Sequence, residues 1–183
     1  MGKNKRSKLK FEDIEIDSQE EWHFFQWLKE AKELGIVKDY IYQPDEFLLT
    51  NKKTYIPIYN NPKQKEKHLF REHIYTADFK IQFNAAHGEI LSKVFKIDAS
   101  MLINETITVY VDIKGSFNRN GGDRLFSIHQ KLVYEKYGVL VQKIVPKEVF
   151  KHLGIAKASL HTPTGRPSKI YSSYNFIPKM FGI

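Results

Sequence analysis

The chain of 183 residues is 42% hydrophobic and 14% aromatic, which is enough for one folded domain with a full core. It has no cysteine, which excludes disulfides and thiolate chemistry, and no apolar stretch as long as a membrane span. The formal charge of +8 and the pI of about 9.4 favour nucleic acid as a partner, with a generic basic surface as the simpler alternative. Because no signal peptide is recognisable, we expect a cytoplasmic protein without membrane contact.

The chain opens with a basic arm, residues 1–10, in which five residues are Lys or Arg. We expect this arm to be disordered and to serve either solubility or contact with phosphates. Residues 18–35 predict the first helix, because Ser18 is a favourable N-cap, Glu21 follows at capping-box spacing, and Gly35 is a natural stop. Its apolar stripe comprises Trp22, Phe24, Phe25, Trp27, Leu28 and Ala31.

Two strands and a projecting segment are predicted next. Residues 40–49 have the pattern of a strand interrupted by Pro44, which indicates an edge strand or a bulge. Residues 50–72 are polar and predict a projecting loop or hairpin, whereas residues 73–83 alternate and predict a half-buried strand. The apolar face of that strand carries Tyr75, Ala77, Phe79, Ile81 and Phe83, and the polar face carries Thr76, Asp78, Lys80 and Gln82.

A long connection and a second strand–helix pair follow. Residues 84–105 predict an elaborated connection with a short strand over 92–97, and the β-branched run that begins at Thr106 predicts a long strand. The loop 115–124 holds three glycines and two arginines, a composition that brings backbone N–H groups close to a phosphate. Residues 125–137 then predict the second long helix.

The last part of the chain predicts a short apolar strand over 139–145 and a short helix from Pro146 to Leu153. A strand–helix–strand order in so short a span implies a right-handed parallel crossover. We therefore expect one domain over residues 11–154 and a C-terminal tail, residues 155–183, that packs on the body or on a partner.

The tripeptide Asp112-Ile113-Lys114 ends the long strand. Strand side chains alternate between faces, so Asp112 and Lys114 point the same way, as a structural ion pair or as half of a metal-dependent site. Asp78 lies on the polar face of the preceding strand. Because sequential strands usually pair, two carboxylates and an ammonium are expected to meet at one end of the sheet.

Such a set suits phosphodiester hydrolysis. Carboxylates are hard oxygen ligands for magnesium, which lowers the pKa of a bound water and screens the scissile phosphate. A lysine can orient that water and stabilise the developing negative charge. The backbone carbonyl of Ile113, between Asp112 and Lys114, is a candidate for a further ligand.

The motifs Ala77-Asp78 and Asp112-Ile113-Lys114 resemble those of the PD-(D/E)XK nuclease superfamily, with Ala77 in place of the proline in the family name. Within it the chain looks most like small phage and prophage endonucleases related to Holliday-junction resolvases, over residues 17–145. The resemblance implies an α/β fold with a restriction-endonuclease-like αβββαβ core, in which helices flank a mixed central sheet. The segments 50–72 and 84–105 would be insertions. The matching stretches are Asp17-Ser18 with Glu21, Tyr75 to Phe79, Val111 to Gly115, and Phe126 through Lys131-Leu132 to Tyr137-Gly138.

The resemblance also implies roles. Asp78, Asp112, Lys114 and Glu21 would be catalytic, and Asp78, Asp112, Ile113 and Glu21 would bind Mg²⁺, with Mn²⁺ as a substitute. Glu20 is the alternative to Glu21 as the third acid, and the capping role of Glu21 explains that residue without any metal. Such enzymes imply a phage-infected or prophage-bearing bacterial cell as the setting.

The expected partners are duplex or branched DNA and a second copy of the chain in a homodimer. Candidate DNA contacts, beside the basic run 63–67, are Lys80, Arg119, Arg124, His129, Gln130 and Lys131. Gln130 and Tyr134 also have the Gln-x-x-x-Tyr spacing of exonuclease-type members. Two alternatives stay open: a non-catalytic DNA-binding or assembly module with a nuclease fold, and a protein-interaction factor with an acidic partner.

Overall fold

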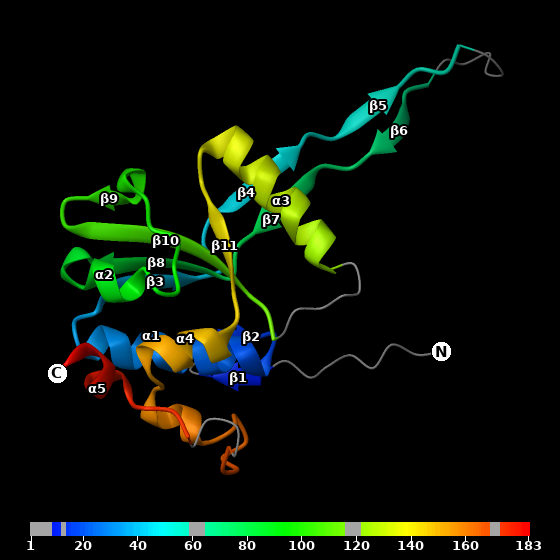
Figure 1. Ribbon diagram of the computed structural model, residues 1–183. Helices are drawn as coiled ribbons and strands as arrows, with labels where there is room; N and C mark the ends of the chain where they lie inside the picture. The colour runs from blue at the N-terminus through cyan, green and yellow to red at the C-terminus, as the bar shows by residue number, and fades with distance from the viewer. Residues whose placement is uncertain (1–8, 12–13, 59–64, 116–121, 169–172) are drawn as a thin grey trace.

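The computed structural model describes residues 9–11, 14–58, 65–115, 122–168 and 173–183. Its centre is a mixed sheet in the order β11-β10-β8-β3, with β9 paired to β10 beside that path (Figure 1). β10 pairs antiparallel with β8 and parallel with β11, and β3 pairs antiparallel with β8. The bounds of these strands are β3 Val37–Tyr42, β8 Phe79–Asn84, β9 Leu102–Ile103, β10 Thr106–Ile113 and β11 Val141–Ile144.

The first helix, α1 (Gln19–Glu33), begins as its sequence predicts. Ser18 is the N-cap, and its hydroxyl accepts a hydrogen bond from the backbone N–H of Glu21 at 3.1 Å. At the other end Gly35 has a φ of +73°, the left-handed conformation that commonly ends helices. The first turn of α1, next to the Ser18 cap, carries the two acids Glu20 and Glu21.

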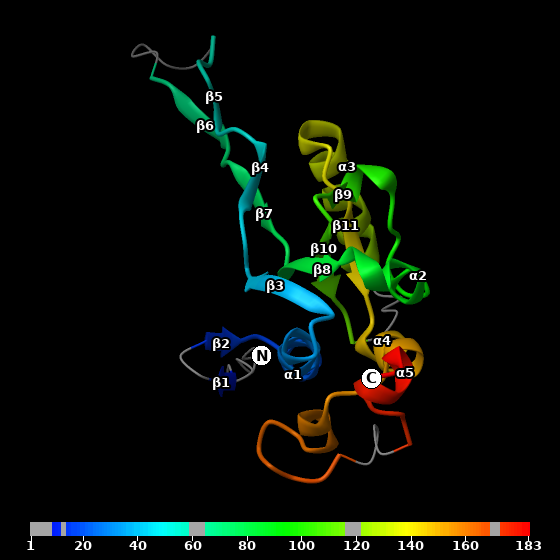
Figure 2. The same cartoon turned by 90° about the vertical axis from the view of Figure 1, so that its left-hand side faces the viewer.

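Helices cover both faces of the sheet (Figures 1 and 2). On one face lie α1, α4 (Pro146–Leu153) and α5 (Ile177–Phe181), and these helices and the sheet enclose the larger core. On the other face lies α3 (Gly122–Tyr137), above a smaller cluster. The larger core includes Phe24, Trp27, Phe79, Phe83, Val109, Val111, Phe150 and Ile177, and the smaller one includes Phe47, Tyr75, Ala77, Phe126, Val133 and Val141.

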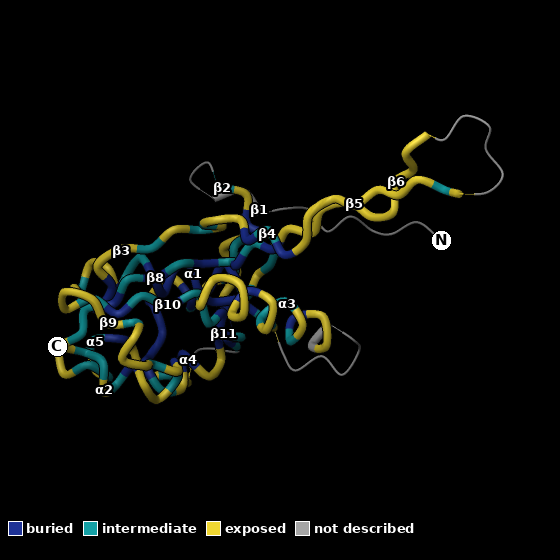
Figure 3. The backbone as a smooth tube through the Cα atoms, turned by 90° about the horizontal axis from the view of Figure 1, so that it is seen from above, coloured by how far each residue is buried: buried dark blue, intermediate teal, exposed yellow. Residues whose placement is uncertain are grey.

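A two-stranded arm projects from the body, as Figures 1 and 2 show. β4 (Glu46–Thr50) pairs with β7 (His73–Thr76) at its base, and β5 (Lys53–Tyr55) pairs with β6 (Lys67–Phe70) farther out. The predicted excursion over 50–72 is therefore part of a hairpin. Exposed residues cover the outer ribbon (Figure 3).

The alternating segment 73–83 is two strands rather than one. β7 belongs to the arm and β8 to the central sheet, and Ala77-Asp78 separates them. The segment 40–49 is similarly divided into β3 and β4 around Pro44, next to Gln43 with a φ of +46°. Both divisions arise because the chain leaves the sheet after β3 and returns to it before β8.

The strand predicted over 92–97 is wrong. This segment follows a short helix, α2 (Gly88–Leu91), and continues as turns. Leu91 and Phe95 are both buried, and their spacing of four residues suits helical turns rather than a strand. The remaining elements are strands β1 (Leu9–Phe11) and β2 (Ile14–Ile16) and the 3₁₀ turns η1 (Ala85–His87), η2 (Ala99–Met101) and η3 (Lys157–Leu160).

The architecture is of the α/β class, with a mixed sheet between helices, as predicted. Along the chain the body elements run α1, β3, β8, β10, α3, β11, and the strand–helix–strand end of this series forms a parallel pair. In the C-terminal tail, Ile177 is fully buried in the larger core. Within the described residues, no helix combines the length and apolar character needed to cross a membrane.

Candidate active site

Asp78 and Asp112 lie on neighbouring strands at one end of the sheet. β8 and β10 pair antiparallel, and their last bonded pair joins Phe79 to Val111. One step further in this register sets Asp78 opposite Asp112. By alternation Asp112 shares the face of Tyr110, which packs against the smaller core under α3. The two carboxylates therefore come level where the arm joins the sheet.

Asp78 is held by the backbone on both sides. Its carbonyl accepts a hydrogen bond from the N–H of Gln43 at 2.8 Å, and its Oδ2 accepts one from the N–H of Ile113 at 2.6 Å. Burial, followed by the charges of Asp112 and Glu21, raises the pKa of the Asp78 carboxyl to about 8, against the hydrogen bond from Ile113 and the charge of Lys114. Asp78 thus holds a proton near neutral pH unless a cation compensates the neighbouring charges.

Asp112 and Lys114 form an ion pair. Lys114 Nζ lies 2.6 Å from Asp112 Oδ2, and Asp112 is buried whereas the lysine side chain is 39% exposed. Burial lowers the pKa of Lys114, but the hydrogen bond and the charge of Asp112 outweigh it, so that the net pKa is raised. Lys114 is therefore a stable cation that bridges the buried acids and the solvent.

Glu21 is the third acid of the group, because its charge acts on both Asp78 and Lys114. Its Oε1 accepts a hydrogen bond from Ser18 Oγ at 2.7 Å, and its Oε2 accepts one from Tyr42 Oη at 3.0 Å. Burial raises its pKa, and these two hydrogen bonds oppose the rise. Glu21 thus takes part both in the cap of α1 and in the acidic group.

Glu20 points elsewhere. A Cβ built on Gly115 would lie 2.7 Å from Glu20 Oε1, so this carboxylate rests against the backbone of the loop that follows the Asp112 strand. A glycine at position 115 permits that approach. Of the two acids in the first turn of α1, Glu21 is the one whose charge acts on Asp78.

Two further polar groups border the acids: Tyr75, which the sequence pattern placed on an apolar strand face, and His129, which stays a predicted DNA contact. Tyr75 is 9% exposed, and its Oη has no hydrogen-bond partner among the described residues. Burial, then the charges of Asp112 and Asp78, raise its pKa. His129 lies 5.0 Å from Tyr75 between ring centroids and 4.8 Å from His73, and its buried Nε2 also lacks a partner within the described part of the chain. Burial and His73 lower the pKa of His129.

The other predicted DNA contacts are dispersed. Lys80 lies 3.5 Å from Asp45 Oδ2 and 5.4 Å from the centroid of the Tyr110 ring, and Gln130 Nε2 donates to the carbonyl of Val141 at 2.6 Å. Arg124 and Lys131 are exposed on α3. Arg119 and Lys63 lie outside the described residues.

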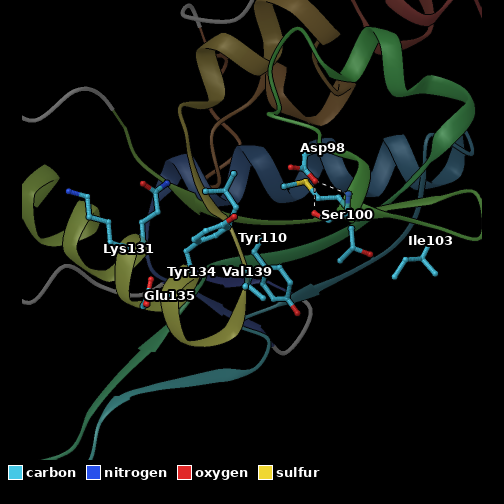
Figure 4. Close-up of a pocket in the computed structure, with 13 residues that line it drawn as sticks. Asp98, Ser100, Ile103, Tyr110, Lys131, Tyr134, Glu135 and Val139 are labelled. Atoms are coloured by element: carbon cyan, nitrogen blue, oxygen red, sulfur yellow. Dashed lines mark hydrogen bonds between the residues drawn. The ribbon is translucent and has the colours of Figure 1, made fainter.

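A groove of about 720 Å³ lies beside α3 (Figure 4). Gln130, Lys131 and Tyr134 line it from the helix, and Thr108 and Tyr110 line it from β10, so the Gln-x-x-x-Tyr pair shares one surface. The acids Glu21, Asp78 and Asp112 are not part of its lining. The groove and the acidic group therefore both involve β10 but are formed by different residues.

The acidic group suits a hard divalent cation. Among the described residues no set of three or more His, Asp or Glu side chains forms a ready-made metal cage. Magnesium does not need one, since it commonly binds through one or two carboxylates and keeps waters and substrate phosphate as its other ligands. The raised pKa of Asp78 beside two further carboxylates is the electrostatic situation that such a cation relieves. Asp78, Asp112, Glu21 and the carbonyl of Ile113 are the candidate ligands.

In comparisons with family models, with curated proteins and with solved structures, nothing matches this chain. What the site does is therefore inferred from its own geometry.

Proposed function

We propose that this protein is a divalent-metal-dependent DNA endonuclease that hydrolyses phosphodiester bonds at the group formed by Asp78, Asp112, Glu21 and Lys114. The observation that carries the proposal is the pair of level carboxylates, one of them with a pKa near 8, beside a cationic lysine. An ion pair for its own sake needs only Asp112 and Lys114. The second carboxylate, that of half-buried Asp78, makes the group less stable without a cation, and such a destabilised group is typical of functional sites.

The residues divide the chemistry among them. A bound Mg²⁺ would supply an activated water and charge compensation at the phosphate. Asp78 and Asp112 would hold that ion, and Tyr42 and Ser18 would fix the direction of Glu21. Lys114 would orient the attacking water and stabilise charge on the phosphate oxygens. Water adds to phosphorus, the bond to the leaving sugar oxygen breaks, and that oxygen takes up a proton.

The order α1, β3, β8, β10, α3, β11 and the mixed sheet support the resemblance to the PD-(D/E)XK nucleases. The net charge of +8 supports a polyanionic substrate. A branched or junction DNA and a homodimer enter the proposal by family analogy. The rival function is a non-catalytic DNA-binding module of the same fold, and a pair of carboxylates, one buried and one half-buried, beside a polyanion argues against it.

The test is nicking of supercoiled plasmid and of a four-way junction with Mg²⁺ or Mn²⁺. We expect the wild-type protein to cut, Asp112→Asn and Asp78→Asn to be inactive, and Lys114→Ala to lose about 10²- to 10³-fold in rate. Asp39→Asn is the matched control, because Asp39 pairs with Lys32 at 2.7 Å on the exposed surface. Failure of the wild type on both substrates with every metal, or full activity of Asp112→Asn, would exclude catalysis at this group.

A further inference from the structure

The outer ribbon of the arm presents a regular surface that the acidic group does not explain. Cross-strand partners point to the same face, and here Lys53 pairs with Phe70 and Tyr55 pairs with Lys67. Lys53 and Tyr55 share a face because they are two residues apart on β5. On β6 the register shift at Lys53/Thr54 brings Phe70 and Lys67 to that same face. These four residues, Lys53, Tyr55, Lys67 and Phe70, form the ribbon face.

The ribbon face is open to solvent. Tyr55 is 47% exposed and Phe70 is 44% exposed, and both lysines are exposed as well. Large aromatic side chains on an unsupported two-stranded ribbon gain little from the fold of the arm itself. Their exposure is therefore more consistent with an external partner than with packing.

The side chains of the ribbon face favour one class of partner. Aromatic rings stack on unpaired bases without regard to sequence, and adjacent cations bind the phosphates between those bases. The described part of the ribbon, residues 51–58 and 65–71, contains five Lys or Arg residues and one carboxylate, Glu66. The Thr54 hydroxyl donates to that carboxylate. Two such basic ribbons repel each other, which disfavours a second copy of the chain and favours a polyanion.

We propose that the ribbon face is a binding site for an unpaired nucleic-acid strand, in which Tyr55 and Phe70 stack on bases and Lys53 and Lys67 contact phosphates. The base of the arm, β7, ends two residues before Asp78. A nucleic-acid strand held on the ribbon face is thus bound by the arm, and the returning strand of that arm, β7, leads directly into the acidic group. The inference deepens the proposed function by naming DNA with unpaired segments as the substrate class, and to that extent it rests on that function.

Binding is measured apart from cleavage, in the Asp112→Asn background. Fluorescence anisotropy with labelled dT20 and with a 20-bp duplex, each over a series of salt concentrations, gives the affinities. We expect Tyr55→Ala/Phe70→Ala to weaken dT20 binding by about 10- to 100-fold and duplex binding by less than about threefold. Lys53→Ala/Lys67→Ala should weaken both and reduce the salt dependence. His68→Ala, on the opposite face of the ribbon, is the control and should bind as the parent does.

Three results would overturn the inference. The aromatic double variant could bind dT20 as tightly as the parent. It could lose dT20 and duplex binding equally, which would make the ribbon a general phosphate contact. Alternatively, the parent could sediment as a dimer and the aromatic variant as a monomer, so that the ribbon face is an interface between copies. Because no readout depends on cleavage, a protein that binds dT20 through Tyr55 and Phe70 but cuts no DNA would refute only the proposed function.

Discussion

Replacement of Asp78 by asparagine should stabilise the metal-free protein as the pH rises. The folded pKa of about 8 lies above the ordinary aspartate value of about 4, so the folded state binds a proton that the unfolded chain releases. The stability linked to that proton is fully present below about pH 4 and is lost as the pH rises toward 8. Asparagine cannot ionise, and its side-chain oxygen can still accept from the N–H of Ile113.

The magnitude follows from linkage. Between pH 4 and pH 7 the carboxylate loses at most about 4 kcal/mol of stability, from about 1.36 kcal/mol for each pH unit. Because side chains and water rearrange around an ionised group, we expect a measured gain of about 1–3 kcal/mol for Asp78→Asn at pH 7. For a chain of this length that corresponds to a Tm increase of about 3–10 °C.

The assay is thermal and urea unfolding in EDTA at pH 4.5, 6, 7 and 8. Asp98→Asn is the matched control, because Asp98 is exposed and its hydrogen bonds with Ser100 lower its pKa instead of raising it. The variant and the wild type should converge toward pH 4.5 and separate toward pH 8. Added Mg²⁺ should close the gap at pH 8 by stabilising only the wild type. A difference in Tm that does not change with pH would refute the conclusion that burial and neighbouring acids raise the pKa of Asp78.

Three other predictions follow from the contacts described. In low Mg²⁺ the nicking rate should rise with pH up to about 8, as Asp78 loses its proton, and higher Mg²⁺ should move the midpoint to lower pH; a flat profile would contradict a ligand role for Asp78. Tyr42→Phe should reduce nicking by about 3- to 10-fold with no loss of Tm, since it removes the hydrogen bond to Glu21 Oε2 and, besides it, one exposed hydrogen bond from Gln43 Nε2. A rate equal to wild type would show that the bond to Glu21 does not position that acid. Gly154→Ala should lower the free energy of unfolding by about 2–4 kcal/mol, because φ is +83° and a Cβ would lie 2.7 Å from the backbone N of Ile177. Gly165→Ala, with a φ of +80° and nothing within 4 Å of the added Cβ, should lower it by about 1–2 kcal/mol; calorimetry measures both.

The parts of the site that depend on local pattern were accessible from the sequence. Alternation places Asp112 and Lys114 on one face of a strand, and the ion pair at 2.6 Å agrees with that. The cap of α1 likewise follows from Ser18 and Glu21, whose spacing suits the first turn of a helix. Such features need only the geometry of one strand or one helix.

The parts that depend on tertiary packing were not accessible. Tyr42 reaches Glu21 from the end of an edge strand, and Tyr75 reaches the acids from the base of the arm. The sequence pattern treated 73–83 as one strand, because Tyr75, Ala77 and Phe79 keep the alternation although Tyr75 and Ala77 enter one core and Phe79 enters the other. No local pattern predicts that the chain passes from the arm to the central sheet at Asp78.

The unequal cores have a consequence for the order in which the native state opens. The sheet face under α1 carries most of the buried aromatic and aliphatic side chains, whereas few residues hold α3 in place. In native-state hydrogen exchange the amides of α3 should therefore exchange through a sub-global opening, at a lower free energy than those of β8 and β10. Such an opening would uncover Asp112, Tyr75 and His129 while Glu21 stays fixed on α1. The three acids lie on or beside α1, β8 and β10 and so stay in the more stable cooperative unit, whereas His129 moves with α3. A ligand that contacts both His129 and the acids would couple the opening of α3 to the rest of the fold.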